Sequence, residues 1–221
     1  DVVVERLRRL RPSARIIHEV NVSGQGSNRI DVLAVDIDEI IAVEIKSERD
    51  TMSRAEAQVR AMRDITHHVI VALHECHLIE QETNEHAAQY GRLNGKHYLR
   101  IAPPETKGAM TWVYPERTRH HAGFDYDVGM WLQPARRMEQ SLPSTALHLL
   151  WRDELATLCD RLRIYRGRRS TMTDMTRAIW WYATGREITK GICAALRMRK
   201  FAEADAPIYD RAIEMAEADG K

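Results

Sequence analysis

The sequence predicts an α/β fold, with a small core of strands and helices followed by a helical extension. Short apolar runs of strand length alternate with amphipathic stretches as far as residue 114. The composition then shifts to Gly, Pro, Arg and His without a clean period. Beyond this stretch, apolar residues recur at helical spacing. We therefore expect a core domain over residues 1–114, a linker or irregular segment over 115–144, and a basic helical domain over 145–221.

The core should contain a helix, three strands, a second helix and a fourth strand. Val3, Leu7 and Leu10 form one stripe of a helix that Pro12 ends. The sequence from Ser53 to Glu56 (SRAE) is a capping box, so a helix should begin near Arg54. The short link at residues 36–39 makes a hairpin of the second and third strands. The four strands are expected over residues 14–22, 30–35, 40–45 and 69–73.

The rest of the chain should add two strands and more helices. Residues 78–90 are polar and favour a helix, whereas 97–102 and 109–114 favour strands joined by a turn through Pro103, Pro104 and Gly108. Thr171 is a good N-cap for one of the later helices. The later helices are expected over residues 147–162, 172–183, 187–200 and 205–216.

Composition excludes several classes of protein. The 221 residues, 44% of them hydrophobic, suffice for a real core. No apolar run approaches eighteen residues, so we expect no membrane partner. Cys76, Cys159 and Cys193 are scattered and form no C-x-x-C pair, which argues against a disulfide framework and favours a reducing, cytoplasmic location.

One acid-x-Lys motif stands out by its position. Such motifs occur three times in the chain, so the triplet alone is weak evidence. Glu105-Thr-Lys107 lies beside a Pro-Pro turn, and Asp219-Gly-Lys221 ends the sequence. Only Glu44-Ile-Lys46 lies on a predicted buried strand, after a strand that carries Asp31 and before a capped helix. Its position, more than its composition, predicts a site.

The geometry of a strand favours a metal-dependent hydrolytic site here. Glu44 and Lys46 point to the same face of their strand, and the hairpin partner can bring Asp31 to that face. Ionisable groups at the edge of an apolar sheet are costly to desolvate without a counter-charge. Mg²⁺ or Mn²⁺ would supply that charge and activate water, with Lys46 orienting the attacking water. The alternative interpretation is a structural salt bridge at a strand end.

These residues carry a resemblance to a known superfamily. The order of elements, Asp31 and Glu44-Ile-Lys46 resemble the PD-(D/E)xK, or restriction-endonuclease-like, nucleases. The stretch EIKSERDTMSRAEAQV, and more loosely LLWRDELATLCDRL and AALRMRK, resemble bacterial and phage proteins known as sce7726-like. The resemblance implies an αβββαβ core, with Asp31 and Glu44 as metal ligands and Lys46 as the catalytic lysine. Ile30 stands where the superfamily often has proline.

The resemblance adds three residues to the predicted site. Glu5 on the first helix is the candidate for a further metal-facing glutamate, and an exposed helix acid is its alternative reading. Gln58 matches the polar residue that often completes the site from the second helix; a solvent-facing residue is the alternative. Ile45 completes the predicted metal-binding set. His74-Glu-Cys-His77 is a weaker metal candidate, better explained as a surface cluster.

A local excess of basic residues suggests a polyanion partner. Eleven Lys or Arg residues lie between Arg161 and Lys200, against only Asp174 and Glu187 as acids. A solvated helical face is the alternative. Residues expected to bind nucleic acid are Arg166, Arg168, Arg169, Arg186, Lys190 and Arg197.

Two further features of this segment bear on nucleic acid. Trp180-Trp181 could stack on bases, although we expect one ring to be buried because adjacent helical positions diverge. The last two helices before residue 200 fit a helix-turn-helix, but a plain helical hairpin is favoured.

The leading hypothesis is a Mg²⁺- or Mn²⁺-dependent deoxyribonuclease encoded by a bacterium or phage. DNA is the expected substrate, RNA is an open alternative, and a homodimer or a protein partner is compatible with the sequence. The rival hypotheses are a non-catalytic nucleic-acid-binding adaptor that keeps the fold and a structural protein of a phage or mobile element.

Overall fold

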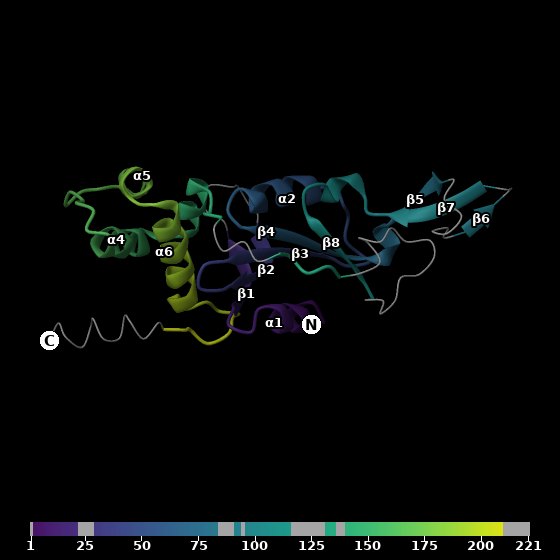
Figure 1. Cartoon of the computed structure of the whole chain (residues 1–221), viewed down its shortest axis with the longest axis horizontal. Coiled ribbons are helices and arrows are strands. Elements are labelled where there is room, and N and C mark those ends of the chain that lie inside the picture. The colour runs from purple at the N-terminus through teal and green to yellow at the C-terminus, as the bar shows by residue number, and fades with distance from the viewer. Residues whose placement is uncertain are drawn as a thin grey trace. The chain divides into compact units, whose positions relative to one another are not determined.

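The computed structural model describes residues 2–21, 29–83, 91–93, 96–115, 131–135 and 140–209 (Figure 1). It is a mixed α/β structure with a five-stranded sheet of order β1-β2-β3-β4-β8 and a three-stranded sheet of order β5-β7-β6. The helices are α1 (Val2–Leu10), α2 (Ala55–Arg63), α4 (Arg152–Arg161), α5 (Met172–Tyr182) and α6 (Gly185–Met198). The strands are β1 (Arg15–Asn21), β2 (Arg29–Val35), β3 (Ile40–Lys46), β4 (His68–His74), β5 (Ile79–Thr83), β6 (Gly91–Leu93), β7 (Lys96–Ile101) and β8 (Met110–Tyr114).

The predicted order of the first six elements is confirmed. A helix, three strands, a helix and a strand follow one another from α1 to β4, each within two residues of its expected bounds. The residues expected on the inner face of α2, Ala55, Val59 and Met62, are all buried. The strongly apolar β3 and β4 are buried along almost their whole length, as expected of strands covered on both faces.

By its contacts the chain divides into two compact units. Unit 1 comprises residues 1–42, 63–67 and 136–221, and unit 2 comprises residues 43–62 and 68–135. These contact units do not say which parts of the chain fold independently. The predicted domain bounds at residues 114 and 144 therefore stay a prediction.

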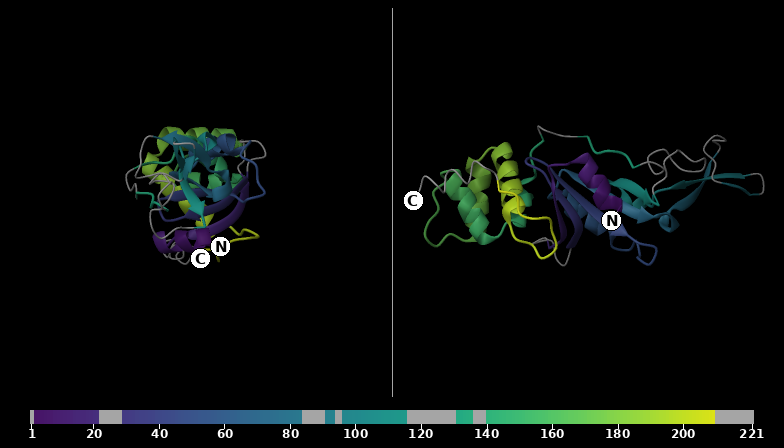
Figure 2. Two further views of the ribbon diagram at one scale, coloured as in Figure 1. Left: turned by 90° about the vertical axis from the view of Figure 1, so that its right-hand side faces the viewer. Right: turned by 90° about the horizontal axis from the view of Figure 1, so that it is seen from below.

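In unit 1, β1 and β2 form an antiparallel pair that runs from Arg15 opposite Val35 to Asn21 opposite Arg29. Helices α4, α5 and α6 cluster together (Figure 2). Gly191 of α6 lies where an added Cβ would stand 2.4 Å from a side-chain carbon of Leu158 on α4. A glycine at this position therefore allows the close approach of the two helices.

In unit 2, β8 extends the sheet by pairing in parallel with β4, with Ile70 opposite Met110 and His74 opposite Tyr114. Trp112 of β8 is fully buried and stacks on Trp131, with ring centroids 5.0 Å apart. This stacking holds Trp131 against β8. The two strands expected over 97–102 and 109–114 are present as β7 and β8, but they belong to different sheets.

The helix expected over residues 78–90 is wrong in its described part. Residues Ile79–Thr83 form β5, which pairs antiparallel with β7 from Ile79 opposite Ile101 to Thr83 opposite His97. Pairing with a neighbouring strand overrides the helix preference of this polar stretch. Residues 84–90 lie outside the described residues, as does the glycine-rich turn from Ser23 to Asn28.

The helix expected from Asp205 is also wrong over its described part, because residues 205–209 are not helical. The Asp205 carboxylate accepts hydrogen bonds from Arg8, at 2.6 and 3.0 Å, and from the backbone N–H of Ile16. The backbone N–H of Asp205 donates to the Ile16 carbonyl. These bonds hold the segment extended along β1. Residues 210–216 of the expected helix lie outside the described residues.

Candidate functional site

Three of the predicted site residues meet in unit 2. The Lys46 ammonium donates to Glu44 Oε1 at 2.6 Å and to the Gln58 amide oxygen at 2.8 Å. The Gln58 amide nitrogen donates to the same Glu44 oxygen at 2.6 Å. Glu44 and Lys46 are only 3% and 5% exposed. We call these three residues the Glu44 cluster.

Local structure explains why the cluster forms. Glu44 and Lys46 are two residues apart on β3, so their side chains leave the same face of the strand. Gln58 lies in the second turn of α2, where its N–H donates to the Arg54 carbonyl. Its amide is oriented to donate to the carboxylate and to accept from the ammonium. The salt bridge between Glu44 and Lys46, which was the alternative interpretation of the motif, is therefore present, and the predicted α2 residue Gln58 bonds to both of its members.

The backbone that carries Lys46 is held by residues that the sequence reasoning missed. The Tyr114 hydroxyl donates to the Lys46 carbonyl at 2.8 Å, and His77 Nε2 lies 2.6 Å from the Ser47 carbonyl, to which it donates. Burial, and secondarily the negative charge of Asp50, raise the pKa of Tyr114, which keeps the hydroxyl protonated as a donor. No local pattern could have found Tyr114, because its place depends on β8 joining the sheet beside β4.

The loop after Lys46 is closed by Asp50. The Asp50 carboxylate accepts from the Ser47 N–H at 2.7 Å and from the Ser47 hydroxyl at 2.6 Å. Together these bonds hold the pKa of Asp50 below its usual range. The backbone at the end of β3 is thus held by hydrogen bonds to the carbonyls of Lys46 and Ser47 and by the turn between Ser47 and Asp50.

Asp31, Glu5 and Ile45 are placed as follows. Asp31 is half-buried on β2, between the buried Ile30 and Val32. Glu5 on α1 is 68% exposed and lies 3.4 Å from Arg9. Ile45 is half-buried between Glu44 and Lys46. Asp31 and Glu5 belong to unit 1, so their predicted convergence with the Glu44 cluster stays a prediction.

The donor chemistry of the cluster suits a hard cation. Glu44 offers a carboxylate and Gln58 an amide oxygen, and Mg²⁺ in proteins is typically bound by one or two carboxylates while it keeps several waters. Among the described residues, no group of three or more His, Cys, Asp or Glu side chains is arranged to hold a metal ion. The weaker metal candidate formed by His74, Cys76 and His77 is therefore not arranged as a metal site either. The His74 side chain accepts a hydrogen bond from the Cys76 N–H.

The predicted nucleic-acid-binding residues lie in unit 1 and are mostly exposed. Arg168, Arg169, Arg186 and Lys190 are exposed. Arg166 forms a bidentate pair with Asp160, at 3.0 and 2.8 Å.

Arg197 was predicted to bind nucleic acid from the surface, but the structure places it in the interior. Its side chain is 6% exposed and donates to the carbonyls of Ser13 and Val35, with Asp36 at 3.8 Å. Arg197 therefore ties α6 to the β1–β2 pair and is not a surface cation.

The α5–α6 pair agrees with one sequence-based expectation and departs from another. Helix α6 is buried over most of its length, including Ile188, Ile192 and Leu196, which fits the favoured plain helical hairpin. Trp180 and Trp181 are 56% and 72% exposed. The expectation that one of the two rings is buried is wrong, because α5 buries only Met175 and Ile179 against its neighbours.

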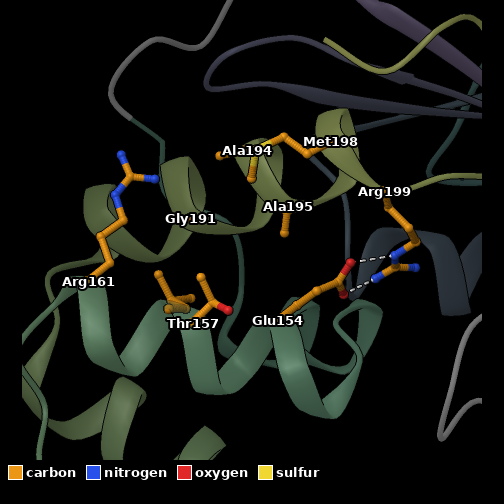
Figure 3. A pocket seen from close by; sticks show the side chains of 9 residues that line it. Glu154, Thr157, Arg161, Gly191, Ala194, Ala195, Met198 and Arg199 are labelled. Carbon is orange, nitrogen blue, oxygen red and sulfur yellow. Dashed lines mark hydrogen bonds and ion pairs between the residues drawn. The ribbon is translucent and has the colours of Figure 1, made fainter. Parts of the chain in front are cut away.

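A groove of about 210 Å³ lies between α4 and α6 (Figure 3). Its floor is formed by small or apolar residues such as Gly191, Ala194 and Ala195. Glu154 pairs with Arg199 at one end, and Arg161 stands at the other. None of the predicted site residues lines it.

Part of the chain is similar to a phage family. Residues 2–85 match the family described as Bacteriophage P4 protein cII. The match runs from α1 through β5 and so includes Glu5, Asp31 and the whole Glu44 cluster, but it spans less than half of the 221 residues. Neither the curated proteins nor the solved structures gave a significant match. No helix of the described residues is long and apolar enough to cross a membrane.

Proposed function

We propose that this protein is a Mg²⁺- or Mn²⁺-dependent nuclease that hydrolyses phosphodiester bonds of DNA. The observation that carries the proposal is the Glu44 cluster, a carboxylate, an ammonium and an amide joined by three hydrogen bonds of 2.6–2.8 Å. The proposed fold is that of the PD-(D/E)xK nucleases, and the similarity to a phage protein family supports a phage or mobile-element origin.

Each residue has a distinct part in the proposed reaction. Glu44 and Asp31 would hold the divalent ion, with Glu5 and Ile45 as further candidates from the resemblance. When bound, the ion lowers the pKa of water and neutralises phosphate charge. Lys46 orients the attacking water and stabilises charge that develops on the phosphate in the transition state. Gln58 holds Lys46 and Glu44 in register before substrate arrives.

Substrate binding is assigned to unit 1. The exposed Arg168, Arg169, Arg186 and Lys190, with Arg166 beside Asp160, supply cations for the phosphate backbone. Binding of this kind weakens steeply as salt rises, because counterions are released from the nucleic acid.

The alternative function is a non-catalytic nucleic-acid-binding protein or phage adaptor that retains this fold. The observation that favours it is the closed arrangement of the cluster, in which Lys46 and Gln58 both donate to one Glu44 oxygen. A protein of this kind would bind nucleic acid with equal affinity whether or not Lys46 is present.

A cutting assay separates the two functions. The protein is incubated with supercoiled, linear and single-stranded DNA and with RNA, in Mg²⁺, Mn²⁺ or EDTA. Cutting should require the metal and fall by about 100-fold or more in both Lys46→Ala and Asp31→Ala. The first variant removes the cation proposed to stabilise phosphate charge, and the second removes a proposed metal ligand.

The second acid-x-Lys motif provides the matched control. Lys107 is exposed beside the short turn at Pro104–Thr106, so Lys107→Ala should cut as fast as the wild type. Equal cutting by Lys46→Ala and the wild type would refute the proposed site. An absence of metal-dependent cutting on every substrate would favour the adaptor.

A further inference from the structure

The end of α5 carries an unusual run of exposed aromatic side chains. Trp180, Trp181 and Tyr182 are consecutive and are 56%, 72% and 74% exposed. Large apolar side chains gathered on a surface usually mark a binding site. The rings of Trp180 and Trp181 lie edge to face, with centroids 6.4 Å apart and planes 64° from parallel. Two ring faces of different orientation are therefore accessible to solvent.

Cations accompany these rings. Arg177 is exposed one helical turn before Trp180 and Trp181, since residues three and four apart are neighbours on a helix. Arg186 and Lys190 are exposed on one side of α6, which begins three residues after Tyr182. We call these six residues the aromatic corner: Arg177, Trp180, Trp181, Tyr182, Arg186 and Lys190.

The two acids of these helices are engaged in capping. Asp174 accepts from the N–H and hydroxyl of Thr171, and Glu187 accepts from the same two groups of Thr184. These bonds lower the pKa of both carboxyl groups and fix them at the helix N-termini. Both carboxylates stay charged but are bound at the helix N-termini, so the three cations Arg177, Arg186 and Lys190 outnumber the acids of the two helices.

We infer that the aromatic corner binds single-stranded nucleic acid. The inference rests on the proposed function and names the form of its substrate. Unpaired bases stack on aromatic side chains while cations follow the phosphates, and this combination is typical of single-strand binding. Bases inside a duplex are already stacked on one another, so they offer no free face to Trp180 or Trp181.

The charge of the corner argues against two other occupants. A symmetric contact with a second copy would bring Arg177 and Arg186 of both copies together, and like charges in one interface cost affinity. An anionic membrane surface would attract the cations, but it offers no stacking partner. Self-association and membrane binding are therefore both measured in the test.

The test measures binding without cutting, in EDTA and with the Lys46→Ala full-length protein. Fluorescence anisotropy is followed with labelled dT20, U20 and a 20-base-pair duplex at several salt concentrations. The single strands should bind tighter than the duplex. Trp180→Ala/Trp181→Ala should weaken single-strand binding by about 30-fold or more and duplex binding by less than about 3-fold. Arg177→Ala/Arg186→Ala/Lys190→Ala should lower the salt slope by about 2.

Two variants serve as controls. Trp180→Phe/Trp181→Phe keeps aromatic faces and should retain most of the single-strand affinity. Tyr165→Ala removes an aromatic side chain that is 91% exposed outside the corner, and it should bind as tightly as its Lys46→Ala parent. Circular dichroism and thermal unfolding check that the exposed substitutions leave the fold intact.

The outcomes separate this inference from the proposed nuclease function. Unchanged single-strand affinity in the double alanine variant, or tighter binding of the duplex, would overturn the inference even if metal-dependent cutting is observed. Trp-dependent flotation with anionic vesicles, or Trp-dependent self-association in sedimentation without single-strand binding, would overturn it in favour of those occupants. If no cutting is found but the variants bind as expected, the inference that the aromatic corner binds single strands is kept and the proposed nuclease function is rejected.

Discussion

Two buried ion pairs of this protein look alike in burial and differ in construction. In unit 1, Arg11 and Glu39 have side chains 4% and 3% exposed, and in unit 2, Lys46 and Glu44 have side chains 7% and 3% exposed. Arg11 uses two nitrogens on the two Glu39 oxygens and a third on the Leu10 carbonyl. Lys46 instead shares one Glu44 oxygen with Gln58.

The difference lies in how easily each cation could change its partners. A planar guanidinium matched to both oxygens of a carboxylate is rigid and directional, and it joins the end of α1 to the turn before β3. An ammonium is a point charge on a flexible stem, and it can change partners without rebuilding the structure. Burial of an ion pair is therefore not by itself evidence of chemistry. The geometry of Arg11 is that of a structural ion pair, whereas that of Lys46 is compatible with the catalytic role proposed for it.

The largest expected effect tests the structural pair. Arg11→Ala leaves Glu39 buried without its guanidinium partner, and it should lower the free energy of unfolding by about 3–5 kcal/mol. Urea unfolding followed by circular dichroism measures it. Arg9→Ala breaks only the exposed pair with Glu5 and should cost less than about 0.5 kcal/mol. Equal losses of unfolding free energy in the two variants would show that the buried Arg11 pair stabilises the fold no more than an exposed pair does.

The second prediction removes both charges of the Glu44 cluster. Glu44→Gln/Lys46→Met eliminates two buried charges at nearly constant volume, so the free energy of unfolding should stay unchanged or rise by about 1–2 kcal/mol. Metal-dependent cutting should disappear. A loss of stability comparable with that of Arg11→Ala would make the cluster structural and erase the contrast between the two pairs.

Features that depend on residues close together in the sequence were predicted well. The period of two on β3 placed Glu44 and Lys46 on one face. Gln58 was expected beside them only from the resemblance, and in the structure it bonds to both. The capping box of Thr171 with Asp174 was likewise foreseeable from spacing, with Thr171 as the expected N-cap.

It failed where distant segments decide the outcome. Residues 79–83 form a strand because β7 pairs with them, and residues 205–209 are extended because Asp205 bonds to Ile16 and Arg8. Arg197 belongs to a basic run, but its burial depends on carbonyls of Ser13 and Val35, more than 160 positions earlier. Charge counting along a sequence cannot distinguish such an arginine from a surface cation.

The third prediction concerns the support of Lys46. Tyr114→Phe removes the donor to the Lys46 carbonyl and should lower the free energy of unfolding by about 1 kcal/mol. If Lys46 is catalytic, the turnover number should fall by more than the stability change would require, with the KM for DNA unchanged. Tyr98→Phe, a tyrosine on β7, provides the control. An unchanged turnover number would give Tyr114 a purely structural role.

The smallest effect concerns the exposed turn that follows the buried cluster. Bonds from the hydroxyl and N–H of Ser47 hold the pKa of Asp50 below its usual range. A carboxyl with a lowered folded pKa stabilises the fold above its unfolded pKa, about 3.9, and this contribution disappears as pH falls through the lower folded pKa. Ser47→Ala removes one of the two bonds, and because Asp50 is exposed we expect a cost of only a few tenths of a kcal/mol at pH 6. Urea unfolding at pH 6 and at pH 2.5 should show this difference shrinking at the lower pH. A difference that persists at pH 2.5 would mean that Ser47 acts through packing, and that the turn is held independently of the Asp50 charge.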